Sequence, residues 1–130
     1  LCPHRGLSLA LPENSMAAFG AAVAMGAEEI EFDLWNTKDG EIVSIHDPTL
    51  DRVSNGHGTV SEHTLEELLA LDFGKGHGDA FKGMKIATFE EILKKFACHA
   101  IMNIHIKFEA QTDFEKKCFD KVIALIRRYD

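Results

Sequence analysis

The chain has 130 residues, 45% of them hydrophobic, which predicts one globular domain with a sizeable core. Its 21 acidic and 14 basic residues give a net charge of −7, which argues against nucleic acid or an anionic membrane as the main partner, because both repel a net anion. The longest apolar stretch, residues 16 to 27, is too short to span a bilayer. A local basic pocket for a small phosphate remains compatible with this balance.

The first half of the chain predicts a strand, a helix and two more strands. Residues 1 to 3 read as the end of a strand, and Asn14 as the N-cap of a helix from residue 16 to about 25. Residues 29 to 34 alternate strictly between acidic and apolar side chains, which is typical of a strand. A turn follows, and residues 41 to 45 predict a second extended run.

The second half predicts an irregular insertion followed by helices around one strand. Residues 47 to 86 are rich in turn residues, with one short helix over residues 64 to 71. Thr-x-x-Glu capping boxes begin this helix and two amphipathic helices, over residues 89 to 96 and 114 to 126. A strand over residues 101 to 106 lies between them. Strands that alternate with helices indicate parallel βαβ units.

Ionisable side chains stand at the end of each predicted strand. In βαβ folds, the carboxyl ends of the strands meet at one rim of the sheet, where reactive groups collect. The residues concerned are His4, Arg5, Glu31, Asp33, His46, Asp47, His105 and Lys107. Because four such ends would share one rim, we expect a single site there.

Glu31 and Asp33 are two residues apart on a predicted strand, so their carboxylates point to the same side and repel each other. A hard divalent cation such as Mg²⁺ or Ca²⁺ between them would relieve this repulsion. The alternative is a solvent-facing pair on an edge strand, because the same alternation marks a half-exposed strand.

His4 and His46 are the candidate base and acid, since imidazole titrates near neutral pH. Structural histidines are the alternative. Arg5 can grip phosphate oxygens with two parallel hydrogen bonds, and its alternative is an ordinary salt bridge. The three cysteines Cys2, Cys98 and Cys118 are widely spaced and form no CxxC motif, which favours free thiols in a reducing compartment. We therefore expect a cytoplasmic location.

A series of short motifs spans residues 3 to 107. They are His4-Arg5-Gly6, Pro12-Glu13-Asn14, Gly26-Ala27, Ile30-Glu31-Phe32-Asp33, Thr37-Lys38-Asp39-Gly40, His46-Asp47, Leu50-Asp51-Arg52, Thr64-Leu65-Glu66-Glu67-Leu68, Thr88-Phe89-Glu90-Glu91 and Asn103-Ile104-His105-Ile106-Lys107. In this combination and order, the motifs resemble the glycerophosphodiester phosphodiesterase family. The final helix matches only in kind.

The resemblance implies an α/β fold, the N-terminal portion of a TIM-type (β/α)₈ barrel. About three βα units would form one partial domain over residues 1 to 130, with the family's insertion at about residues 47 to 86. It also implies metal-dependent hydrolysis of a small glycerophosphodiester to glycerol phosphate and an alcohol, a reaction of lipid metabolism.

The resemblance also assigns roles to residues. The histidines that match His4 and His46 act as general base and acid, and the carboxylates that match Glu31 and Asp33 bind the cation. The remaining matches are the phosphate-contacting Arg5 and Lys107, and Glu13 as a supporting residue.

Two features depart from the family's pattern. Position 105 usually carries glutamate, the third carboxylate ligand, whereas this chain has His105. We expect His105 to bind the cation and to shift its preference from Mg²⁺ or Ca²⁺ toward Mn²⁺ or Zn²⁺. In addition, a complete barrel needs roughly 250 residues. We therefore expect a part of a longer protein or a truncated form, whose open sheet edges are covered by self-association or by a complementary chain.

Three functions are consistent with this sequence. The first is a glycerophosphodiester phosphodiesterase or the half of one that bears its catalytic residues. The second is a non-catalytic interaction or assembly module. The third is a related phospholipase-type phosphodiesterase, which would act on intact lipids rather than deacylated ones.

Overall fold

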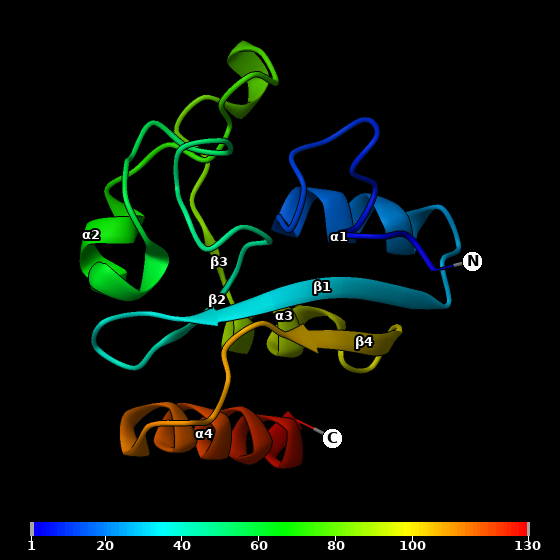
Figure 1. Cartoon of the computed structure of the whole chain (residues 1–130). Coiled ribbons are helices and arrows are strands. Elements are labelled where there is room, and N and C mark those ends of the chain that lie inside the picture. Colours follow the sequence, from blue (N-terminus) through cyan, green and yellow to red (C-terminus); the bar gives the residue numbers. More distant parts are fainter. Residues whose placement is uncertain (1, 130) are drawn as a thin grey trace.

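The computed structural model describes residues 2–129, which form a four-stranded sheet covered by helices (Figure 1). The strand order is β3-β2-β1-β4. Along the chain the elements are α1 (Met16–Ala24), β1 (Glu29–Asn36), β2 (Ile42–Ser44), the 3₁₀ turn η1 (Val60–Glu62), α2 (Leu65–Leu69), the 3₁₀ turn η2 (Asp79–Phe81), β3 (Ala87–Thr88), α3 (Phe89–Phe96), β4 (Ile101–Ile106) and α4 (Asp113–Tyr129).

Helices α1, α3 and α4 pack on one face of the sheet and form the main core with it. In Figure 1, α3 lies behind the strands, between α1 and α4. Phe32, in the middle of β1, has its ring centroid 5.6 Å from that of Phe19 in α1 and 6.0 Å from that of Phe89 in α3. Because successive side chains on a strand alternate, Glu31 and Asp33 point to the opposite face. The helices thus leave this second face free for polar groups.

The segment between β2 and β3 builds a smaller core of its own beside the sheet. It contains α2 and both 3₁₀ turns, and its buried side chains include Leu50, Val60, Leu68 and Phe73. Thr64 caps α2 through the capping box that the sequence predicts, with Glu67 as its partner. The insertion is therefore an ordered structure next to the strand ends.

The mixed α/β fold confirms the predicted class and most of the predicted elements. The cap of α1 differs, because the Ser15 hydroxyl, and not Asn14, accepts the hydrogen bond from the Ala18 amide. Asn14 lies in the left-handed region, with φ of 53°, and its side chain serves the site described below. The predicted strand end at residues 1 to 3 is also wrong for Cys2 and Pro3, which lie outside any strand. Leu1 lies outside the described residues.

The strand pairing departs in part from the expected parallel units. β4 runs parallel to β1, but β2 runs antiparallel to both β1 and β3. The β1–β2 hairpin therefore returns His46 to the level of Asp33, where the Ile45 amide donates to the Asp33 carbonyl. None of the helices within residues 2–129 combines the length and the apolar character needed to cross a membrane.

Candidate active site

The loop before α1 is fastened to the carboxylates of β1 through its backbone. The Arg5 amide donates to Glu31 Oε2 at 2.9 Å. This contact requires a left-handed backbone, with φ of 56° at Arg5 and 76° at Gly6. A Cβ atom at Gly6 would lie 2.8 Å from the carbonyl carbon of Ala18, so only glycine fits against α1. The turn after His4 is thus specified by a close backbone approach.

Asn14 fixes the second carboxylate of β1. Its amide nitrogen donates to Asp33 Oδ2 at 3.0 Å, and its Oδ1 accepts from the Asp33 amide at 3.1 Å and from the Ser44 hydroxyl at 2.9 Å. All three residues are buried. One side chain therefore ties the loop, β1 and β2 together at the level of the site.

Glu31, Asp33 and His105 each offer a ligand atom, and these atoms lie within 4.8 Å of one another. The parallel register explains this arrangement, because Asp33 pairs with His105 and Glu31 with Asn103 across β1 and β4. His105 Nδ1 lies 3.4 Å from Asp33 Oδ1. The His105 side chain is 58% exposed whereas that of Asp33 is 1% exposed, so the group opens to solvent on its β4 side.

The three side chains fit a divalent cation. Asp33 Oδ1 is buried and accepts no hydrogen bond of good geometry within residues 2–129, although Lys107 Nζ and His105 Nδ1 lie 3.2 and 3.4 Å away. A buried carboxylate oxygen without a well-formed hydrogen bond is suited to a positively charged ligand. Two carboxylates and one imidazole form a donor set that divalent cations accept in proteins. The set could hold one ion at the face of the sheet opposite the helices.

Two cationic side chains flank the same carboxylate. Lys107 Nζ lies 3.2 Å from Asp33 Oδ1, and Arg5 Nε lies 3.7 Å from Asp33 Oδ2. Both cations are largely shielded, with side-chain exposures of 17% and 19%. Charged donors that converge beside a metal-type cluster suit a phosphate group, whose oxygens accept several such bonds.

His46 belongs to a hydrogen-bonded chain of charges. Its Nδ1 lies 2.8 Å from Asp47 Oδ1. Arg52 then bridges two carboxylates: Nε donates to Asp47 Oδ2 at 2.7 Å, and Nη1 and Nη2 donate to Glu13 at 2.9 and 2.7 Å. Glu13 also accepts from Arg5 Nη1 at 3.1 Å. Glu13 and Arg52 thereby link the His46 branch to the Arg5 branch of the site.

This chain of charges shifts the acidities of its carboxyl groups. The hydrogen bonds from Arg52, with a smaller contribution from His46, lower the pKa of Asp47 to about 2. Arg52 is also the main cause of the lowered pKa of Glu13. The two carboxylates raise the pKa of Arg52 in return. All three groups are therefore charged at neutral pH, which keeps the network intact.

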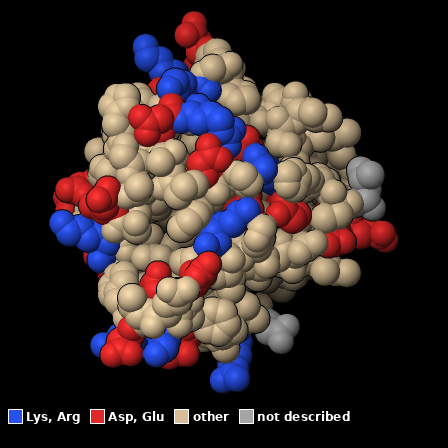
Figure 2. Space-filling view, in the orientation of Figure 1, with Lys and Arg blue, Asp and Glu red and all other residues tan. Residues whose placement is uncertain are grey.

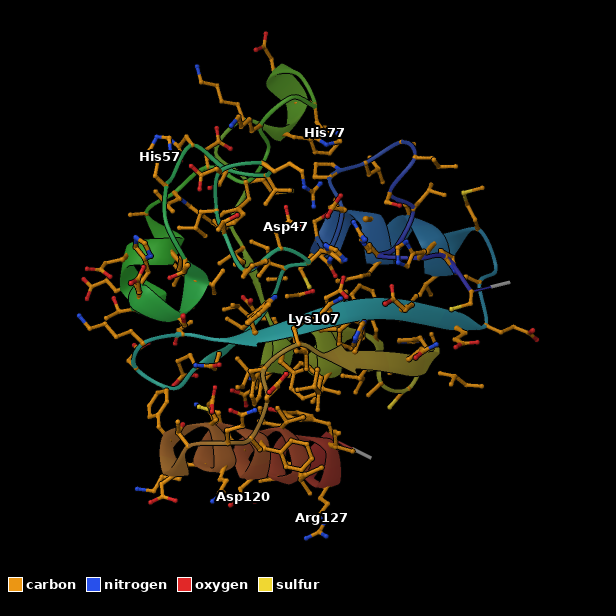
Figure 3. The ribbon with its side chains drawn as sticks, viewed as in Figure 1. Asp47, His57, His77, Lys107, Asp120 and Arg127 are labelled. Carbon is orange, nitrogen blue, oxygen red and sulfur yellow. The ribbon has the colours of Figure 1, made fainter. Side chains whose placement is uncertain are left out.

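The predicted site residues lie on one face of the molecule. Figure 2 shows basic side chains in a band that runs from the insertion toward the end of β4, with acidic side chains beside them. In Figure 3, Asp47 lies between His77 of the insertion and Lys107 at the end of β4. His4 is the most exposed of the predicted residues, 66% exposed, with Nε2 3.8 Å from Glu31 Oε2.

Sequence reasoning missed the roles of Asn14 and Arg52. Asn14 was assigned to a helix cap, which is the usual role of asparagine before an apolar helix. Arg52 is part of the Leu50-Asp51-Arg52 motif, but no function was predicted for it. The available signal was its place five residues after Asp47, in a turn-rich segment where charged side chains reach back to a strand end.

A protein-family model described as the glycerophosphoryl diester phosphodiesterase family matches residues 4–129. A glycerophosphodiester phosphodiesterase from Caldanaerobacter subterraneus is 46% identical over 105 residues, which cover 80% of this chain and 43% of that protein. One from Bacillus subtilis is 36% identical over 134 residues, which cover 97% of this chain and 45% of that protein. The chain therefore spans less than half the length of these relatives.

Solved structures give the same result. The crystal structure of a glycerophosphodiester phosphodiesterase from Agrobacterium tumefaciens matches with a TM-score of 0.87 and 35% identity, over 97% of this chain and 51% of that one. An Oleispira antarctica phosphodiesterase in complex with the product sn-glycerol-3-phosphate matches with a TM-score of 0.89 and 26% identity, over 98% and 51% of the two chains. The fold thus corresponds to about half of these proteins.

Proposed function

Because the chain belongs to the glycerophosphoryl diester phosphodiesterase family, we propose that it carries the catalytic residues of a metal-dependent phosphodiesterase. The substrate is a small glycerophosphodiester, and the products are glycerol phosphate and an alcohol. The observation that carries this proposal is the convergence of Glu31, Asp33 and His105 within 4.8 Å, beside the shielded cations Arg5 and Lys107. The Oleispira antarctica relative holds sn-glycerol-3-phosphate, which supports the same class of product here.

We assign one divalent cation to Glu31, Asp33 and His105. When bound, the ion withdraws charge from a phosphoryl oxygen and makes the phosphorus more electrophilic. Mg²⁺ or Ca²⁺ suits the two carboxylates, and the imidazole of His105 moves the preference toward Mn²⁺ or Zn²⁺. With the charge of Asp33 compensated by an ion, Lys107, which lies 3.2 Å from Asp33 Oδ1, would be available to the substrate.

The remaining residues bind the phosphate and move protons. Arg5 and Lys107 donate to the non-bridging oxygens and stabilise the charge that grows on them. His4 accepts the proton of the attacking hydroxyl group, and His46 donates a proton to the leaving oxygen. Asp47 binds Nδ1 of His46, so Nε2 is the atom that exchanges a proton with the leaving group. Glu13 positions Arg5 through its carboxylate.

Hydrolysis of bis(p-nitrophenyl) phosphate and of glycerophosphocholine, each with different divalent ions, tests this proposal. We expect turnover that requires the ion and that falls at least about 100-fold in His4→Ala and in His46→Ala, because each removes a proton-transfer group. His57→Ala, which changes an 85% exposed histidine of the insertion outside the site, is the matched control. Absence of turnover with every divalent ion would contradict the enzymatic proposal for this chain. Activity on intact lipids instead would favour a phospholipase-type reaction.

We further propose that a second copy of the chain covers the open side of β4. Ile101 at this edge is 69% exposed, and a groove of about 700 Å³ next to it is lined by apolar side chains of α3, β4 and α4. An unpaired strand with apolar neighbours is prone to pair with another strand. Sedimentation equilibrium tests this, because a monomer at all concentrations would contradict it. A chain that assembles but shows no turnover would instead act as an assembly module.

A further inference from the structure

A cavity of about 90 Å³ lies beside His46, between the loop before α1, the end of β2 and the insertion. Its lining, all within the described residues, does not include Glu31, Asp33 or His105. The polar side chains that matter here are Glu13, His46, Arg52, Lys75, His77 and Lys85. The cavity therefore adjoins the proton donor of the proposed reaction without belonging to the metal cluster.

The cavity is cationic in a protein that is strongly anionic overall. Arg52, Lys75 and Lys85 line it together with a single carboxylate, that of Glu13, whereas the chain carries a net charge of −7. Glu13 is already bound by Arg52 at 2.7 Å and by Arg5 at 3.1 Å. The remaining positive charge favours an anion in the cavity and disfavours a quaternary ammonium group.

The two lysines are free of close carboxylate partners. Lys75 Nζ donates to the backbone carbonyl of Asp51 at 2.5 Å. Among the described residues, neither Lys75 nor Lys85 has a carboxylate oxygen within 4.0 Å. Each ammonium group therefore has hydrogen-bond donors available for a ligand.

The size of the cavity limits the ligand. About 90 Å³ holds a few water molecules or a group of similar bulk. Phe73 and Met84 add apolar surface to the lining of the cavity. A short carbon chain that ends in an anionic group fits this combination of volume, apolar wall and positive charge.

We propose that this cavity binds the leaving alcohol, and that it selects glycerophosphodiesters whose two- or three-carbon alcohol carries a carboxylate or a phosphate. This inference rests on the proposed function. If His46 protonates the leaving oxygen, the leaving alcohol lies next to His46 and therefore next to the cavity that His46 lines. Lys75 and Lys85 bind the anionic group, while Arg5 and Lys107 hold the phosphodiester itself. The leaving alcohol thus meets a positive wall before it is released.

Glycerophosphoserine and glycerophosphoethanolamine test the inference, because they differ only by one carboxylate. Their dissociation constants are measured by ¹⁵N NMR titration of the whole chain in the presence of Ca²⁺, which is diamagnetic. The chain carries His4→Ala, so that the diesters are not hydrolysed. We expect glycerophosphoserine to bind about tenfold more tightly, which is the effect of one charge-assisted hydrogen bond. Amide shifts at residues 75 to 86 should accompany this preference.

Charge reversal at the cavity gives the decisive comparison. Lys75→Glu/Lys85→Glu should abolish the tenfold preference, whereas Lys95→Glu/Lys117→Glu, which makes the same change at exposed sites on α3 and α4, should preserve it. Equal affinities for the two diesters, or a preference that survives at the reversed cavity, would overturn the inference and leave the proposed function standing.

The two proposals can fail separately. If glycerophosphoserine shifts the amide signals of residues 75 to 86 but not those of Arg5 and Lys107, the anion site is supported and the proposed phosphodiesterase site is contradicted. Binding of neither diester anywhere on the chain would overturn both.

Discussion

Replacing Arg52 by glutamine tests whether the bridge between Asp47 and Glu13 stabilises the fold through charge. Arg52 makes contacts of 2.7 and 3.1 Å to Asp47 and of 2.9 and 2.7 Å to Glu13. Glutamine has one amide group and no charge, so it cannot reproduce this bridge. The perturbation therefore removes the main cause of the lowered pKa of Asp47 while it keeps a polar side chain of moderate size.

The magnitude follows from the acidity of Asp47. Its pKa falls from 3.8 to about 2, which corresponds to at most about 2 kcal/mol of native-state stabilisation. The Arg52 side chain is 47% exposed, so solvent screening reduces the expected effect to about 1 kcal/mol. Because the folded pKa is below the ordinary value, this contribution is present above about pH 4 and disappears as the pH falls toward about 2.

Urea unfolding followed by circular dichroism measures this pH dependence. We expect Arg52→Gln to lower the free energy of unfolding by about 1 kcal/mol at pH 7 and by progressively less below pH 4. Arg127→Gln, at an exposed position of α4, is the matched control and should have little effect at either pH (Figure 3). If Arg52→Gln lowers the free energy of unfolding equally at pH 7 and at pH 3, the reasoning is refuted, because the effect would then not depend on the charge of Asp47.

Three further changes test other parts of the structure. His105→Glu should raise the affinity for Ca²⁺ about tenfold in calorimetry by adding a third carboxylate to the donor set, and weaker or unchanged binding would count against a ligand role. Gly6→Ala should lower the free energy of unfolding by about 2–4 kcal/mol, because the new Cβ clashes with Ala18 in addition to the strain of a left-handed backbone. Gly26→Ala, which has the same backbone strain but open space at its Cβ, should lower it by only about 1 kcal/mol. Equal losses would disprove the clash. Thr88→Ala should cost about 1 kcal/mol in urea unfolding through loss of the α3 capping box, and an unchanged midpoint would contradict it.

Local sequence patterns predicted the elements because each pattern reflects a local preference of the backbone or of a strand face. The alternation in residues 29 to 34 correctly places Phe32 and Asp33 on opposite faces of β1, although both side chains are buried. Thr64 and Thr88 begin the helices that their capping boxes predict. The same local logic could not give the direction of β2, because alternation is identical in parallel and antiparallel strands. The antiparallel hairpin was therefore found only in the structure.

The site was predicted as a set of residues but not as a network. A family resemblance assigns roles to positions, and it grouped Glu31, Asp33 and His105 without any distance between them. The role of Asn14 depends on a left-handed backbone that holds its amide between β1 and β2, and that conformation leaves no periodic signal. Arg52 reaches Glu13 across 39 positions of the chain, and such long-range pairing follows from tertiary packing alone.

The pairing of β1 with β4 also protects the site against errors in strand alignment. A slip of β4 by one residue would turn His105 to the helix-covered face while Glu31 and Asp33 stay on the opposite face, so the three side chains could no longer converge. A slip by two residues would keep the faces but move His105 roughly 7 Å along β1, away from Asp33. The alternation that builds the core therefore also fixes the relative positions of the three candidate ligands.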